Sequence, residues 1–199
     1  MLLGAEDIPI HIPSYLTEGR KPGFLAELKK FKELVRFYQP LPDPEPLQGD
    51  GWHRLPIYDF ETGELDHIKG IVLSNSCDLA AENNALIPPT LVFAPIVAIS
   101  TYRAVLEEEG IEADVIEQNL KDIREQRIST MFFLPAAGVL AEDHMAKMDE
   151  AYTVPASLFQ LADPPTRLFS LYDVAFYLFT FKLSYHFCRL HEKIDRTPA

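Results

Sequence analysis

The chain has 199 residues, of which 47% are hydrophobic and 24% charged, with a formal net charge of −12. This composition predicts one soluble globular domain with appendages, and its longest apolar run, Val174 to Phe181, is far shorter than the roughly 20 residues of a membrane span. With two cysteines and a first segment that lacks the features of a signal peptide, we expect a cytoplasmic protein without disulfides, cofactors or a membrane anchor.

The negative charge is concentrated in the middle of the chain. Residues 37–123 hold sixteen acidic and four basic side chains, whereas the two flanking thirds are nearly balanced. Surfaces that bind phosphate groups need Lys and Arg to displace counterions. The charge distribution therefore disfavours nucleic acid as a partner.

The N-terminal residues 1–39 are predicted to form an arm. Pro22 suits the first turn of a helix, and apolar residues then recur at helical spacing from Phe24 to Tyr38. The alternating prolines of residues 40–46 cannot continue this helix and predict a stiff linker over residues 40–49. A ligand for a proline-recognition domain is the alternative interpretation of the linker.

The main domain, residues 50–199, opens with a predicted antiparallel sheet. Trp52–Phe60 reads as a strand in which Pro56 marks an edge or a bulge, and Glu61–Glu64 has the composition of a turn. A returning strand covers His67–Ser74, and after a loop over residues 75–89 a third strand covers Thr90–Ile99. The apolar runs in these last two strands are typical of strands buried on both faces.

An acidic helical insertion is predicted over residues 101–127. Ser100 or Thr101 can cap a first helix that ends near Gly110, and Ile116, Leu120 and Ile123 form the apolar stripe of a second. The acidic face from Glu107 to Glu117 predicts a docking surface for a basic protein partner, with a simple solvated face as the alternative.

The remaining segments are two more strands and a closing helix. Met131–Pro135 and, more weakly, residues 147–154 are predicted strands, and Ser170-x-x-Asp173 resembles a capping box that opens a helix over residues 170–193. Aromatic side chains surround this helix, so it must be covered on most faces. We expect either the N-terminal helix or a second copy of the chain to cover it, which predicts a homo-oligomer.

This order of elements resembles the PemK/MazF-like family of small barrel proteins, whose known members are toxin endoribonucleases. The resemblance rests on Trp52–Phe60, Ile71–Asn75, Leu91–Ile96 and Ala151–Leu158, and it covers residues 50–100 and 143–190 in short pieces. It implies an α+β fold with a small SH3-like, PemK-like antiparallel β-barrel, to which the N-terminal helical arm, the acidic insertion and the long apolar C-terminal helix are added.

The resemblance does not extend to the catalytic positions. The family places an Arg before the first apolar run and a Thr or Ser after the Pro-Ile of the next strand. In this chain Ile68 or Lys69 occupies the first position and Val97 the second. RNA cleavage needs a cationic or acidic group beside the phosphate and a general base. The resemblance therefore implies a degenerate member or one with different chemistry.

Cys77 and Asp78 are the main candidates for other chemistry, with Arg54 as a third catalytic candidate. A loop cysteine becomes a nucleophile when a His, here His53 or His67, lowers its pKa. The alternative is that Cys77 is a buried apolar residue while Ser74, Asn75 and Asp78 satisfy loop backbone groups.

A binding site is predicted from Trp52, Arg54, Ser74 and Asn75. Trp52 could stack on a base or on a partner's side chain with Arg54 as the cation, and packing of Trp52 in the core is the alternative. No metal site is predicted, because Cys77, His53, His67 and Asp78 lack any paired ligand spacing. His186, Cys188 and His191 fall on different faces of the last helix.

From these features we expect a non-catalytic interaction or regulatory protein, in a toxin–antitoxin or phage-defence setting that the resemblance implies. The alternative is an enzyme, either a diverged endoribonuclease or one that depends on Cys77.

Overall fold

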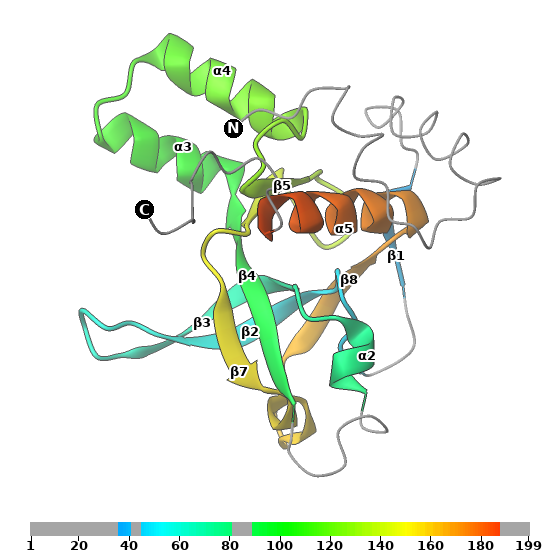
Figure 1. Cartoon of the computed structure of the whole chain (residues 1–199). Helices are drawn as coiled ribbons and strands as arrows, with labels where there is room; N and C mark the ends of the chain where they lie inside the picture. Colours follow the sequence, from blue (N-terminus) through cyan, green and yellow to red (C-terminus); the bar gives the residue numbers. More distant parts are fainter. Residues whose placement is uncertain (1–35, 41–44, 81–88, 188–199) are drawn as a thin grey trace, which may run out of the picture.

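The computed structural model describes residues 36–40, 45–80 and 89–187, and it is an α+β fold built on a curled antiparallel sheet (Figure 1). The path of hydrogen-bonded strands runs β1-β8-β2-β3-β4-β6-β5, and β7 pairs with β4 beside this path. The strands are β1 (Tyr38–Gln39), β2 (Gly51–Tyr58), β3 (Leu65–Val72), β4 (Thr90–Ala98), β5 (Met131–Leu134), β6 (His144–Lys147), β7 (Tyr152–Pro155) and β8 (Thr166–Leu171).

The sheet curls until its two ends approach each other. The hydroxyl of Tyr38, in the strand at one end of the path, donates to the carbonyl of Pro135 at 2.9 Å, and Pro135 directly follows the strand at the other end. Burial and the charge of Asp143 raise the pKa of Tyr38, so this donor keeps its proton. The result is a half-barrel with α5 (Asp173–Phe187) lying across it (Figure 1).

Strand β4, which the apolar run predicted, pairs with three other strands of the described sheet. Its first half, Thr90 to Phe93, pairs with β7, and its second half, Ile96 to Ala98, pairs with β6. Strand β3 pairs with β4 along the other edge, with Gly70 opposite Pro95. A Cβ at Gly70 would lie 2.5 Å from the ring of Phe93, so glycine is required where the two strands pack.

Three apolar clusters cover the sheet. The largest lies under α5 and includes Phe132 and Phe179, whose rings meet edge to face at 5.2 Å. The second surrounds Trp52 and Phe93, and the short helices α2 (Ser76–Leu79) and η4 (Ala156–Gln160) contribute to it. The third joins α3 (Ile99–Glu108) and α4 (Ala113–Arg124) to β5 and β6.

Several predicted boundaries are wrong. Tyr38, expected on the N-terminal helix, lies in β1. The expected strand over residues 147–154 is two strands, β6 and β7, separated by a turn. Ala98 rather than Ser100 or Thr101 is the N-cap of α3, and it makes no side-chain cap hydrogen bond. The loop over residues 75–89 contains the short helix α2.

The start of the C-terminal helix is the largest correction. Ser170 does not cap the helix but lies in β8, where it is 2% exposed and opposite Gln39 of β1. The helix begins at Asp173, and eight of its residues are buried by the chain itself: Val174, Ala175, Leu178, Phe179, Thr180, Phe181, Lys182 and Tyr185.

Other expectations concern residues outside the described ranges. These are the N-terminal helix before residue 36, the linker residues 41–44, the part of the loop over residues 81–88, and the end of the last helix with Cys188 and His191. Within the described ranges, the helices are all too short or too polar to cross a membrane.

Candidate functional site

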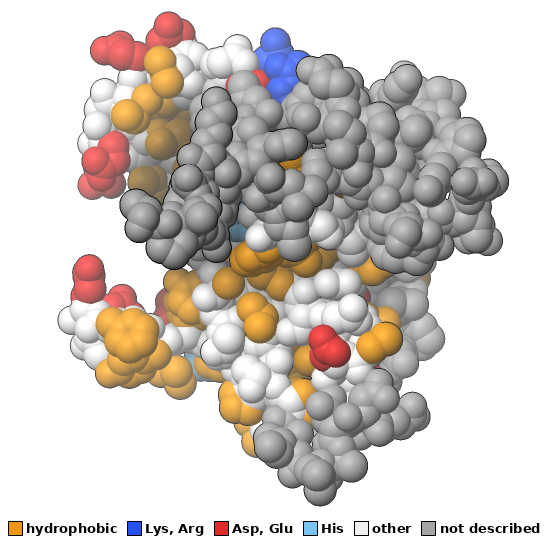
Figure 2. Space-filling view, in the orientation of Figure 1, with side chains coloured by type: hydrophobic (Ala, Val, Ile, Leu, Met, Phe, Trp, Pro, Cys, Tyr) orange, Lys and Arg blue, Asp and Glu red, His pale blue; other side chains and the backbone are white. Residues whose placement is uncertain are grey.

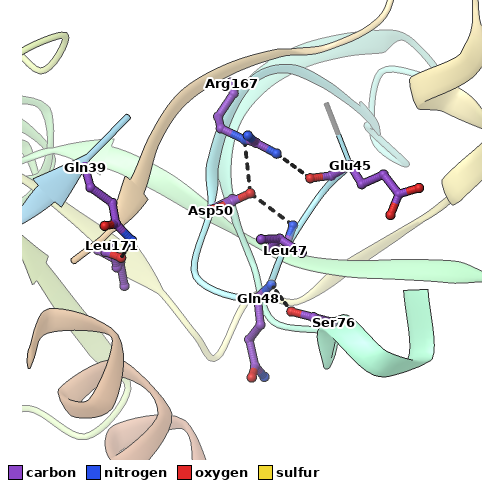
Figure 3. Close-up of polar contacts among 8 residues, drawn as sticks. All are labelled: Gln39, Glu45, Leu47, Gln48, Asp50, Ser76, Arg167 and Leu171. Carbon is purple, nitrogen blue, oxygen red and sulfur yellow. Dashed lines mark hydrogen bonds and ion pairs between the residues drawn. The ribbon is translucent and has the colours of Figure 1, made fainter. Parts of the chain in front are cut away.

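The Ser74–Asp78 segment is held by its own side chains. Ser74 Oγ accepts from the backbone N–H of Val92 at 2.7 Å, which ties the end of β3 to β4. Asn75 is the N-cap of α2, and its Oδ1 accepts from the N–H of Cys77 at 2.9 Å. Ser76 Oγ accepts from the N–H of Gln48 at 3.0 Å (Figure 3). Each of these polar side chains therefore has a role in positioning backbone.

Cys77 and Asp78 are both exposed on α2. The alternative in which Cys77 is buried is therefore wrong. His67 lies five residues before the end of β3, which is about 16 Å of extended strand, and α2 with Cys77 follows that end. The length of the strand therefore separates His67 from Cys77. No three metal-ligating side chains gather into a site in the described part of the chain.

A buried network lies beside this segment, around Asp50 and Arg167 (Figure 3). Arg167 Nε lies 3.1 Å from Asp50 Oδ2, and the two side chains are 13% and 2% exposed. The same carboxylate oxygen accepts from the N–H of Leu47 at 3.0 Å, and the guanidinium also donates to the carbonyl of Glu45. The network fastens the residues before β2 onto β8.

Arg167 also covers the only tryptophan of the chain. Its guanidinium carbon lies 4.8 Å from the centroid of the Trp52 ring, and the ring of Phe159 meets Trp52 edge-on at 4.7 Å. Trp52 is 4% exposed, and its indole N–H has no hydrogen-bond partner among the described residues. The ring of Trp52 thus packs inside the protein and is not presented for stacking on a ligand.

Arg54 lies where the backbone of β2 is irregular. It has a positive φ of 67°, within a register shift of β2 between Trp52 and Leu55. Its side chain forms a bidentate ion pair with Asp163, with Nη1 2.6 Å from Oδ1. That contact lowers the pKa of Asp163. Trp52 and Arg54 therefore do not form the joint binding site that the sequence suggested.

The structure pairs Lys69 of β3 with His144 of β6, which sequence analysis missed. Lys69 Nζ lies 3.4 Å from His144 Nε2, and His144 Nδ1 lies 2.8 Å from the carbonyl of Glu142. Since a carbonyl only accepts, Nδ1 carries the proton, and Nε2 presents its lone pair to the ammonium group. His144 is 4% exposed, so the pair is an oriented imidazole beside a cation at a buried position.

One cavity of about 500 Å³ lies between β1, β8 and the loop after β5. Its lining is mostly apolar, and its two guanidinium groups already have intramolecular contacts. Arg36 lies over the ring of Tyr172 at 4.9 Å, and Arg167 belongs to the Asp50 network. The cavity has room for a small ligand but holds no group of catalytic side chains. It is lined by Arg36, Phe37, Tyr38, Gln39, Pro40, Ala137, Gly138, Val139, Arg167, Leu168 and Phe169.

The acidic insertion forms a helical hairpin that projects from the sheet (Figure 1). Arg103 joins the two helices, with Nη1 2.6 Å from Glu117 Oε1, and this contact lowers the pKa of Glu117. Val105, Ile111 and Val115 are 50%, 41% and 55% exposed on this hairpin. Large apolar side chains therefore lie among the carboxylates of the insertion.

No family model matches the chain, and no curated protein matches it.

Proposed function

We propose that this chain is a non-catalytic interaction protein that docks a basic partner protein on the α3–α4 hairpin. The proposal rests on one observation, the exposed apolar side chains Val105, Ile111 and Val115 within an acidic surround. Exposed apolar side chains rimmed by charge are typical of protein interaction sites where they gather in a patch. A degenerate PemK/MazF-like barrel is the scaffold we propose, and the toxin–antitoxin or phage-defence setting follows from that resemblance.

The charges of the hairpin indicate the chemistry of the partner. Glu107 and Glu117 are paired with Arg103, whereas Glu108, Glu109 and Glu112 have no ion-pair partner within the described ranges. These exposed carboxylates would steer a partner that presents Lys and Arg around an apolar centre. We also propose self-association through the last helix, and the contact we propose for it is made by Phe187, which is 60% exposed.

Reversing two of these charges should weaken partner binding at least tenfold. A photo-crosslinking amino acid at position 105 or 115 would identify the partner in cells, and titration calorimetry with the purified partner would measure the affinity of the Glu108→Lys/Glu109→Lys variant. The control is Asp78→Lys/Glu142→Lys, which changes the net charge equally at exposed positions elsewhere. Equal affinity of the two variants, or an acidic partner, would contradict the proposal.

A second candidate function is phosphodiester cleavage at Lys69 and His144. Lys69 is one of the two residues at the position where the resemblance places the catalytic Arg, and His144 pairs with Ala98, next to Val97 at the hydroxyl position. A lysine and an imidazole oriented by a backbone carbonyl could supply the cation and the base that such cleavage needs.

This second candidate predicts that the purified chain cuts a fluorescent single-stranded RNA, with a loss of at least 100-fold in His144→Ala, in line with the usual contribution of a general base. His53→Ala is the matched control, because His53 is exposed on β2. RNA that stays intact with the unchanged protein removes the candidate and leaves the interaction function.

A further inference from the structure

The β2–β3 hairpin ends in an exposed apolar tip that no part of the fold explains. Phe60 is 90% exposed, Leu65 is 64% exposed and Tyr58 is 51% exposed. The rings of Tyr58 and Phe60 meet edge to face at 5.2 Å, and Leu65 lies opposite Tyr58 in the pairing of β2 with β3. The hairpin stands away from the sheet, and its apolar tip is visible as a separate projection (Figures 1 and 2).

The turn that carries Phe60 is closed by four hydrogen bonds of Asp59. Asp59 Oδ1 accepts from the N–H groups of Glu61 and Thr62 at 2.7 and 3.1 Å. The backbone of Asp59 also bonds to Gly63 and Glu64, at 2.8 and 2.9 Å. The backbone donors lower the pKa of Asp59, so the carboxylate stays charged and the turn stays closed at neutral pH. A turn whose backbone is ordered before binding loses less entropy when it binds.

The charges around the tip select among partners. Residues 58–67 contain four carboxylates, those of Asp59, Glu61, Glu64 and Asp66, and no Lys or Arg. Anionic lipid and nucleic acid are repelled by such a surface. Two tips placed together in a dimer would bring eight carboxylates into one interface. A protein pocket that is apolar at its centre and basic at its rim would bury the apolar side chains of the tip and pair with its carboxylates.

We propose that the β2–β3 tip is an anchor that inserts Phe60 into an apolar pocket with a Lys- or Arg-rich rim on a partner protein. Tyr58 and Leu65 pack around the entrance, while Glu61 and Glu64 pair with the rim. This contact is separate from the α3–α4 hairpin and does not depend on the docking proposed there.

The test uses a phage-displayed library of random twelve-residue peptides selected on the full-length chain. We expect the enriched peptides to combine apolar residues with Lys or Arg. Fluorescence anisotropy of a selected peptide should show binding at least tenfold weaker to Phe60→Ser, and weaker binding to Glu61→Lys/Glu64→Lys. Leu161→Ser is the matched control, because Leu161 is an exposed apolar residue of another loop, at 57%. It should bind like the unchanged protein.

Other outcomes overturn the proposal. The proposal fails if the enriched peptides are acidic, if the selection enriches no peptide, or if Phe60→Ser and Leu161→Ser bind the selected peptide equally well. Two further outcomes would assign the tip to another occupant: a dimer in sedimentation that Phe60→Ser dissolves, or flotation with phosphatidylcholine vesicles that Phe60→Ser abolishes. Melting temperatures should be equal for all variants. The Glu108→Lys/Glu109→Lys variant should keep peptide binding, so failure of the α3–α4 docking and failure of the tip are distinguished.

Discussion

Replacement of Lys182 by alanine should lower the free energy of unfolding by about 4 kcal/mol, which combines the loss of a buried side chain with unsatisfied acceptors. Lys182 lies on α5 and is fully buried. Its ammonium group donates to the carbonyl of Gln126 at 3.0 Å, to the side-chain oxygen of Gln126 at 2.9 Å and to the carbonyl of Met131. Three donors thus meet three acceptors, all of them uncharged.

The position of these acceptors explains the size of the effect. Gln126 follows α4 with a positive φ of 60°, and its side-chain amide exchanges two hydrogen bonds with the backbone of Phe133, as a neighbouring strand would. Lys182 therefore fastens α5 to the junction between α4 and β5. Urea denaturation would measure the change. Lys182→Met retains much of the volume and should cost less, and Ser184→Ala, at an exposed position of the same helix, should cost nothing measurable.

The stability contributed by Lys182 also depends on pH. Burial lowers the pKa of Lys182 in the folded protein well below 10.5. At pH values between this pKa and the pKa of the same lysine in the unfolded chain, the unfolded chain holds one proton more than the folded protein. Stability then rises with pH in this window, by at most about 1.4 kcal/mol per unit, and is constant below the folded pKa. The difference between the unchanged protein and Lys182→Met should therefore grow towards pH 10. The window closes near pH 10, where the lysine of the unfolded chain also loses its proton. The raised pKa of Tyr38 makes both proteins lose stability above pH 10, so its effect cancels in the difference. A difference that shrinks as pH rises would contradict this account.

The sequence predicts the parts of the fold that depend on local patterns. The apolar runs of β3 and β4 and the stripe of Ile116, Leu120 and Ile123 in α4 predicted elements that the structure contains. Strand β8 was missed because its partners, β1 and β2, lie more than a hundred residues away in the chain. The local pattern Ser170-x-x-Asp173 favoured a helix cap instead, and pairing with distant strands decided the outcome.

The candidate sites also divide into contacts that the local sequence suggests and contacts that depend on distant strands. Lys69 and His144 are 75 positions apart, and only the register of β3, β4 and β6 brings them together. Arg167, whose guanidinium lies over the ring of Trp52, comes from the distant strand β8. By contrast, the capping role of Asn75 is local, and the composition of the loop was enough to suggest it, whereas Ser74 binds the backbone of β4, 18 residues away.

The Asp50→Ala substitution should cost about 3–5 kcal/mol, the usual result of removing one partner of a buried ion pair. Asp50 is 1% exposed, and its loss leaves the guanidinium of Arg167 without its carboxylate and the N–H of Leu47 without its acceptor. Asp50→Asn keeps an oxygen for Leu47 and should cost less. Urea denaturation followed by the fluorescence of Trp52 would measure both, since this ring lies under Arg167.

A matched control and a double-mutant cycle separate the ion pair from the fold around it. Asp163→Asn removes the partner of Arg54 in an exposed pair, where solvent screens the charges, and we expect no measurable change in stability. Arg167→Met alone leaves Asp50 as an unpaired buried charge and should be as harmful as Asp50→Ala. The double variant Asp50→Ala/Arg167→Met should be more stable than the sum of the two losses predicts, because neither charge is then left without its partner. Additive losses would mean that the two residues stabilise the segment before β2 independently, and the network would not act as one unit.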